Sequence, residues 1–229
     1  DRDVSSFSNF RFEELDAAVY QNTNVFHVSG ITLALSESVR ENAIKMIREF
    51  KKNNAFISFD VNYRASLWDE DTARTTIKSI LPYVDILFVS EETLRRMFRQ
   101  TGDLENILRS FTAEYKNVKV VMSTMRKAIS PTKHTFTSLA YDCVQGSFYH
   151  EAPYENIEVV DRIGSGDAYV AGALFGLLKY QTIDDAVRFG NAMAALKNTI
   201  PGDMTACDFA DIQRVIDAHT KGQASEMVR

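Results

Sequence analysis

The chain has 229 residues, of which 45% are hydrophobic and 25% are charged, and its net charge is -5. This length and hydrophobic fraction support one sizeable core and exclude a disordered chain, while the negative charge argues against a nucleic-acid partner. The two cysteines, Cys143 and Cys207, are too few for a disulfide framework or a zinc site. No apolar run is long enough to span a membrane and the first residues are polar, so we expect a cytoplasmic protein.

The first half of the chain alternates short β-rich runs with segments whose apolar residues recur at helical spacing. Ser36 and Asp69 are expected to cap two of the helices. The strand at residues 24–31 is expected to be buried, with His27 as a packed residue. The predicted elements are a helix at 12–20, a strand at 24–31, a helix at 36–52, a strand at 55–60, a helix from 69 to about 81, a strand at 84–89, a helix opening at 90–93, a helix at 104–115 and a strand at 118–123.

The second half is expected to begin with a β-hairpin and to end in helices. The predicted elements are strands at 136–141 and 147–150, and helices from the turn at 161–167 to about 180, at 183–198 and at 208–219, followed by a disordered polar tail at 221–229. The alternation predicts an α/β fold of three layers with a doubly wound, mostly parallel sheet. We find no repeat or linker and expect one domain over 1–229. Ligands of such folds lie at the carboxyl ends of strands.

Residues 161–167 (Asp-Arg-Ile-Gly-Ser-Gly-Asp) form a glycine-rich turn in front of an apolar helix. The first amides of a helix have no internal partner and carry partial positive charge, so the turn is a candidate anion site. Asp167 places a carboxylate at its rim, which suits a base in phosphoryl transfer. The alternative is an ordinary strand-to-helix turn with a surface carboxylate.

Two common nucleotide-binding motifs are excluded. Tyr169 stands where a dinucleotide fingerprint has its third glycine, and the chain contains no P-loop sequence. Gly172 and Gly176 lie four residues apart on the following helix, and we expect them to allow close helix packing and not to bind a ligand.

Four segments together resemble the ribokinase-like (PfkB) carbohydrate kinases, and within them the 2-keto-3-deoxygluconate kinases. The resemblance covers about residues 24–204. The segments are 161–169 (Asp-Arg-Ile-Gly-Ser-Gly-Asp-Ala-Tyr), 59–68 (Phe-Asp-Val-Asn-Tyr-Arg-Ala-Ser-Leu-Trp), 123–127 (Ser-Thr-Met-Arg-Lys) and 198–203 (Asn-Thr-Ile-Pro-Gly-Asp).

The resemblance implies ATP-dependent phosphorylation of the terminal hydroxyl of 2-keto-3-deoxygluconate. Asp167 would contact that hydroxyl and act as the general base, and the amides of Gly164, Ser165 and Gly166 would form the anion hole. Gly166 would also touch ATP. Mg²⁺ would bridge the phosphates, and a monovalent cation such as K⁺ would bind near the glycine turn through carbonyl groups.

The segment around Asp60, Asn62 and Arg64 is the expected sugar-acid site. A keto-acid substrate needs a fixed cation for its carboxylate, and the resemblance assigns this part to Arg64. The alternative is a surface arginine paired with Asp60 or Asp69. Trp68 is expected to be a packing anchor at the start of a helix.

Four further residues are implied in ATP binding: Ser90, Thr124, Arg126 and Asn191. Ser90 stands where many members carry the Asn of an N-x-x-E motif, and Thr93 stands at its Glu position. The segment at 123–127 has fewer glycines than the usual nucleotide loop. Arg126 is expected to reach a phosphate, or else to be a solvated loop charge, and Asn191 is expected near the adenine ring.

Members of the resembling family are longer at the amino end, where they carry further strands and a β-lid. We therefore expect this chain alone to have little activity, and the complete protein to be a homo-oligomer. Two other functions stay open. One is a kinase for a neutral sugar such as fructose or ribose, and the other is a non-catalytic nucleotide-binding fragment of the same fold.

Overall fold

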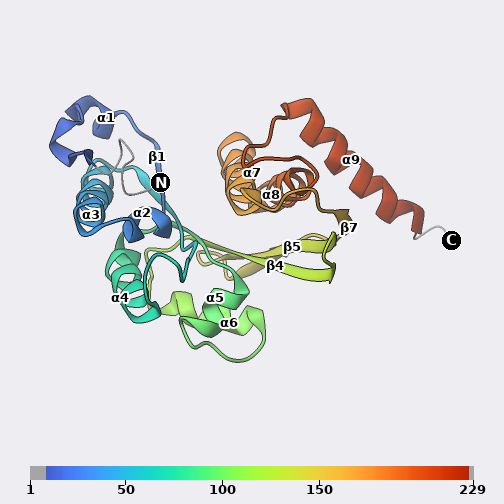
Figure 1. The fold of residues 1–229 in the computed structure, drawn as a ribbon, viewed down its shortest axis with the longest axis horizontal. Helices are drawn as coiled ribbons and strands as arrows, with labels where there is room; N and C mark the ends of the chain where they lie inside the picture. The colour runs from blue at the N-terminus through green and yellow to red at the C-terminus, as the bar shows by residue number, and fades with distance from the viewer. Residues whose placement is uncertain (1–8, 227–229) are drawn as a thin grey trace. The chain divides into compact units, whose positions relative to one another are not determined.

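The computed structural model describes residues 9–226 (Figure 1). Residue contacts divide the chain into two compact units. Unit 1 contains the chain up to residue 123 together with 141–147, and unit 2 contains 124–140 together with the chain from 148 onward. The prediction that these residues form a single domain stays a prediction. Among the described residues, no helix combines the length and the hydropathy needed to cross a bilayer.

Unit 1 is built on a parallel sheet. Its strands are β1 (Val25–Ser29), β2 (Phe56–Asp60), β3 (Ile86–Phe88) and the first part of β4 (Val120–Ser130), and they pair in that order. The strands are rich in β-branched and aromatic residues, and Ile57, Phe59, Leu87 and Val121 are fully buried. The predicted mostly parallel α/β fold is therefore confirmed.

The helices of unit 1 begin where capping side chains predict. The hydroxyl of Ser36 accepts a hydrogen bond from the Val39 amide, and the Asp69 carboxylate accepts one from the Thr72 amide. The elements are 3₁₀ turns at Phe12–Glu14 and Leu81–Tyr83, and helices α1 (Ala17–Gln21), α2 (Gly30–Ala34), α3 (Glu37–Lys52), α4 (Glu70–Ile80), α5 (Glu91–Arg96) and α6 (Leu104–Ala113). The helix predicted at 12–20 is in fact the first 3₁₀ turn and α1.

Strand β1 departs from the expectation of a buried strand. It ends at Ser29, the N-cap residue of α2, and only Val28 of its five residues is buried. His27 is exposed, with its Nδ1 atom 2.9 Å from the hydroxyl oxygen of Ser58. The physical reason is that β1 stands at the end of the strand order and pairs with β2 alone among the described strands.

Unit 2 combines strands with three long helices, which Figure 1 shows as α7, α8 and α9. Strand β5 follows β4 in the strand order, β6 follows β5, and β7 pairs antiparallel with β5. The elements are β5 (Lys133–Asp142), β6 (Ser147–His150), β7 (Tyr154–Glu158), α7 (Ser165–Tyr180), α8 (Ile183–Asn198) and α9 (Phe209–Glu226). Strand β7 was not predicted. Helix α9 includes residues 221–226 of the tail that was predicted to be disordered, and residues 227–229 lie outside the described part, so the disordered tail stays a prediction.

Helices α7 and α8 pack closely because of small residues. A Cβ atom on Gly172 would lie 2.4 Å from the carbonyl oxygen of Phe189, and one on Gly176 would lie 2.6 Å from the backbone of Asp185. Neither distance is compatible with a side chain. The packing role predicted for these glycines is confirmed.

Candidate functional site

The glycine turn opens α7 as predicted, and Gly164 is its N-cap residue with φ of 78°. A Cβ atom on Gly164 would lie 2.0 Å from the carbonyl oxygen of Asp203. The position therefore requires glycine twice, for its left-handed backbone and for the close approach of the next loop. The Ser165 amide donates a hydrogen bond to the Arg162 carbonyl at 3.2 Å, so within the turn this amide already has an acceptor.

The first turn of α7 is open on the side of Gly166 and Asp167. Both residues are exposed, and a Cβ atom on Gly166 would meet no described atom within 4 Å. The carboxylate of Asp167 therefore stands at the positive end of a 16-residue helix, with space for a ligand beside it.

The loop at 199–204 is tied to the glycine turn by hydrogen bonds. The Asp161 carboxylate accepts from the amides of Ile163 at 2.9 Å and Gly202 at 3.0 Å, and these bonds hold its pKa below the usual value. The Asn198 carbonyl accepts from the amides of Val160 at 2.8 Å and Asp161 at 3.2 Å. Both segments carry recognisable sequence patterns, but their packing on each other was not predicted.

Lys197 lies beneath this junction and was not among the predicted site residues. It is fully buried, and its ammonium donates to the carbonyl oxygens of Asp161 at 3.2 Å and Ile200 at 3.0 Å. A lysine in the last turn of a helix usually marks a solvated face, so the sequence carried no signal for this position. The contact joins the turn to the loop through a buried charge.

Thr124 and Arg126 lie within β4, and the predicted nucleotide loop at 123–127 is wrong in its secondary structure. The segment lacks glycine and proline, so the backbone stays extended and the strand continues to Ser130. Arg126 is exposed on this strand. Arg126 and Arg162 both act electrostatically on the buried His134, whose pKa burial and these two charges lower. Arg126 therefore shares its electrostatic environment with the glycine turn.

Asn191 is fully buried in α8, although we expected it to face adenine. Its Oδ1 atom accepts from the Ser138 hydroxyl at 2.8 Å, and its Nδ2 donates to Glu151 Oε2 at 3.1 Å. Both polar ends of the amide thus have protein partners. In this structure Asn191 links β5 and the segment after β6 to α8.

Burial raises the pKa of Glu151 to about 7, against lowering effects from Asn191 and Arg188. His219 Nε2 lies 4.0 Å from Glu151 Oε1. Because the folded-state pKa lies above the ordinary value, this group stabilises the fold fully below about pH 4.5, and the contribution is lost as the pH rises through about 7.

Glu151→Gln should therefore raise the melting temperature at pH 8, by about 2–4 °C for each kcal/mol of unfolding free energy that is regained when the buried carboxylate is removed. The effect at pH 5 should be smaller. Thermal unfolding at both pH values measures this difference. Glu155→Gln, at an exposed position of β7, is the control and should change little at either pH. An equal effect of Glu151→Gln at pH 5 and pH 8 would contradict the assignment.

In unit 1, the expected sugar-acid residues follow the carboxyl end of β2. The Asp60 Oδ1 atom accepts from the Asn62 amide at 3.1 Å, and Asn62 has φ of 34°. A Cβ atom on Gly30 would lie 2.1 Å from the Val61 carbonyl oxygen, so the segment is seated against the start of α2. The carboxylate–amide contact holds the chain in its bend after the strand.

Arg64 is exposed, and its Nη1 atom donates to the Tyr63 carbonyl at 3.0 Å. Within residues 9–226 it forms no ion pair with Asp60 or Asp69, the two partners of the alternative reading. Trp68 is buried, as expected of a packing anchor, and the Arg40 guanidinium lies 5.6 Å from its ring centroid.

Ser90 is the N-cap of α5, and its hydroxyl accepts from the Thr93 amide at 3.1 Å. The two hydroxyl oxygens, Ser90 Oγ and Thr93 Oγ1, are 2.8 Å apart. Thr93 therefore completes a capping arrangement at the position where the resembling family carries Glu. In the described part of the chain, no group of three His, Cys, Asp or Glu side chains is placed to hold a metal ion.

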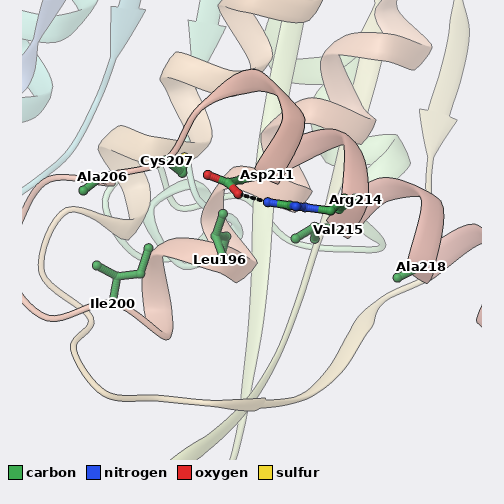
Figure 2. A pocket seen from close by; sticks show the side chains of 8 residues that line it. All are labelled: Leu196, Ile200, Ala206, Cys207, Asp211, Arg214, Val215 and Ala218. Atoms are coloured by element: carbon green, nitrogen blue, oxygen red, sulfur yellow. Dashed lines mark hydrogen bonds and ion pairs between the residues drawn. The ribbon is translucent and has the colours of Figure 1, made fainter.

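A pocket of about 430 Å³ lies between the end of α8 and α9. Figure 2 shows Leu196 and Ile200 on one wall, Cys207 in the connecting loop, and Arg214 ion-paired with Asp211 on α9. Its lining is mainly apolar and includes none of the predicted site residues.

The comparisons with known structures agree with the fold described above. The solved structure of a PfkB family carbohydrate kinase from Listeria grayi is 33% identical, with a TM-score of 0.84, over 94% of this chain and 66% of that one. A 2-dehydro-3-deoxygluconokinase structure from Thermotoga maritima is 26% identical, with a TM-score of 0.83, over 94% and 65%. A fructokinase double mutant from Vibrio cholerae, solved with fructose, ADP and potassium ion, is 25% identical, with a TM-score of 0.72, over 88% and 64%. The fold is that of the ribokinase-like sugar kinases.

The sequence comparisons identify the family. The model of the pfkB family carbohydrate kinases matches residues 3–208, so the chain belongs to this family. It is 29% identical to a 2-dehydro-3-deoxygalactonokinase of Haloferax volcanii over 94% of this chain and 64% of the relative. It is 28% identical to a 2-dehydro-3-deoxygluconokinase of Bacillus subtilis over 89% and 59%. The chain thus spans less than two thirds of the length of these relatives.

Proposed function

We propose that the protein transfers the γ-phosphoryl group of ATP to the terminal hydroxyl of a 2-keto-3-deoxy sugar acid, with 2-keto-3-deoxygluconate as the substrate. The glycine turn at the start of α7 carries this proposal, because it combines a left-handed Gly164, an open first turn and an exposed Asp167. The names of the Haloferax and Bacillus relatives support the substrate class. A cytoplasmic location and a homo-oligomeric complete protein belong to the same proposal.

Each part of the turn has a distinct role in this mechanism. Asp167 takes the proton from the attacking hydroxyl, which raises the nucleophilicity of that oxygen as the bond to phosphorus forms. The amides at Gly164 to Gly166 and the positive end of α7 stabilise the charge on the phosphoryl oxygens. For the Ser165 amide, this role requires it to exchange its Arg162 acceptor for the ligand. Arg126 contributes a cation for the phosphates of ATP.

Mg²⁺ would neutralise the charge of the phosphates. This ion keeps several water ligands and usually needs only one or two protein carboxylates, so its binding does not require a three-acid cluster. Ser90, Thr124 and Asn191 remain proposed members of the ATP site. For Asn191 the role would be indirect, because its amide is committed to Ser138 and Glu151.

The proposal is tested by phosphate transfer from ATP to a panel of 2-keto-3-deoxygluconate, 2-keto-3-deoxygalactonate, fructose and ribose, with nucleotide binding measured in parallel by calorimetry. We expect a preparation as long as the relatives to transfer the phosphoryl group to the two keto acids. Transfer to fructose or ribose alone would favour the neutral-sugar kinase. If a preparation as long as the relatives bound ATP but transferred no phosphate, the non-catalytic alternative would be favoured.

Arg64→Ala is expected to raise KM for the keto acid by about thirtyfold or more, because a charge-assisted contact to the carboxylate is lost. The KM for a neutral sugar should not change. Steady-state kinetics on both substrate classes measures the ratio. Arg11→Ala, an exposed arginine outside the segment, is the control. An equal loss on both substrate classes would remove Arg64 from the carboxylate site.

A further inference from the structure

Lys197 is a fully buried ammonium in the last turn of α8. An ammonium removed from water is costly unless acceptors replace its hydration. Here the carbonyl oxygens of Asp161 and Ile200 accept from Nζ, at 3.2 and 3.0 Å. The carbonyl end of α8 carries partial negative charge, which also favours a cation at this position. The charge is therefore stabilised where it lies.

The two acceptors belong to the segments that shape the candidate anion site. Asp161 is the first residue of the glycine turn, and Ile200 belongs to the loop that packs on Gly164 through Asp203. The Asp161 carboxylate binds the Gly202 amide of the same loop. The junction between the glycine turn and the loop at 199–204 is thus held by the Lys197 ammonium, by the Asp161 carboxylate and by the close packing of Asp203 on Gly164.

A monovalent cation held by carbonyl groups near this turn is implied by the family resemblance, and the Vibrio fructokinase was solved with a potassium ion. The residues of this chain do not fit such an ion at the junction of Asp161 and Ile200. Their carbonyl oxygens already accept hydrogen bonds from an ammonium, and a second cation beside a buried one would be repelled.

We propose that Lys197 is a positioning residue that supplies the positive charge of a monovalent cation from within the chain. It holds the glycine turn against the loop at 199–204, so that this junction needs no K⁺. The catalytic meaning of that role rests on the proposed kinase function, but the positioning itself can be measured without catalysis.

The test is the melting temperature of the 229-residue chain in KCl, in NH₄Cl and in tetramethylammonium chloride at equal ionic strength. The wild-type protein should melt at the same temperature in all three salts. Lys197→Ala removes the charge and leaves space, so it should melt lower in tetramethylammonium chloride and regain about 2–4 °C in KCl or NH₄Cl through ion binding. Lys197→Met, which fills the space without a charge, should melt lower in every salt with no recovery.

Lys179→Ala is the matched control, because Lys179 is an exposed lysine in the last turn of α7. It should behave like the wild-type protein in each salt. A K⁺-specific rise in the wild-type melting temperature would overturn the proposal, and this measurement stands even if the Ala variant fails to fold. An Ala variant that is as stable as wild type and indifferent to K⁺ would overturn it as well.

Nucleotide affinity and phosphate transfer, measured in the same salts, separate this proposal from the proposed function. Absence of transfer to every sugar by a wild-type preparation as long as the relatives, together with the expected salt pattern of the variants, would reject the kinase mechanism and leave the role of Lys197 intact. In an active preparation, kcat of Lys197→Ala should rise in KCl by about tenfold or more while that of Lys197→Met does not. If the kcat of the wild-type protein depended on K⁺, the proposal would be contradicted.

Discussion

Asp167→Asn is expected to lower the turnover of an active preparation at least about a thousandfold, with little change in ATP affinity. The amide has nearly the shape of the carboxylate but cannot take the proton from the sugar hydroxyl. Asp167 is exposed in the first turn of α7, so its replacement should not disturb the core. Single-turnover kinetics and calorimetry with ATP measure the two quantities separately.

Asp184→Asn is the matched control for this variant. Asp184 is also an exposed carboxylate in the first turn of a 16-residue helix, α8, but it lies outside the glycine turn. It should keep nearly full turnover. If Asp167→Asn kept turnover within tenfold of wild type, Asp167 would not be the general base.

Gly164→Ala is expected to destabilise the protein by about 3 kcal/mol or more, which corresponds to a fall in melting temperature of about 10 °C. The new Cβ atom would need a left-handed backbone at φ of 78° and would lie 2.0 Å from the Asp203 carbonyl oxygen. The loop at 199–204 would have to move away from the turn. ATP affinity should fall with the geometry of the anion site.

Two neighbouring glycines separate the causes of this effect. Gly202→Ala also requires a left-handed residue, at φ of 87°, but its Cβ atom would meet no described atom within 4 Å, so it should cost only about 1–2 kcal/mol. Gly166→Ala has neither constraint and should leave the melting temperature almost unchanged. If Gly164→Ala cost no more than Gly202→Ala, the close approach of Asp203 would not constrain the turn.

The local elements of this chain follow from local signals. The hydroxyl of Ser36 and the carboxylate of Asp69 cap the helices that they were predicted to cap, since a cap depends on amides only a few residues away. Helix α8 has the predicted bounds, and α7 begins at the glycine turn. The turn itself is visible in the sequence because left-handed backbone and close packing both demand glycine.

The backbone of the segment at 123–127 was not predicted correctly from local sequence signals. Its resemblance to a nucleotide loop predicted irregular backbone, yet β4 runs through it to Ser130. Strand continuity depends on the neighbouring strand β5, and no residue of the segment itself interrupts it. The place of Asn191 near adenine stays a prediction, but the sequence did not reveal its buried hydrogen bonds, because its partners Ser138 and Glu151 lie 53 and 40 residues away in sequence.

By itself, the sequence determined an α/β fold of the pfkB carbohydrate kinase family, with a candidate anion site at residues 164–167 and a carboxylate beside it. The tertiary structure decided what braces that site: the loop carbonyl of Asp203 against Gly164, and the buried ammonium of Lys197 between Asp161 and Ile200. The physical reason is the range of the interactions. Caps, turns and amphipathic faces are set by residues within about one or two helical turns, whereas burial and the pairing of a buried charge depend on segments that only the folded chain brings together.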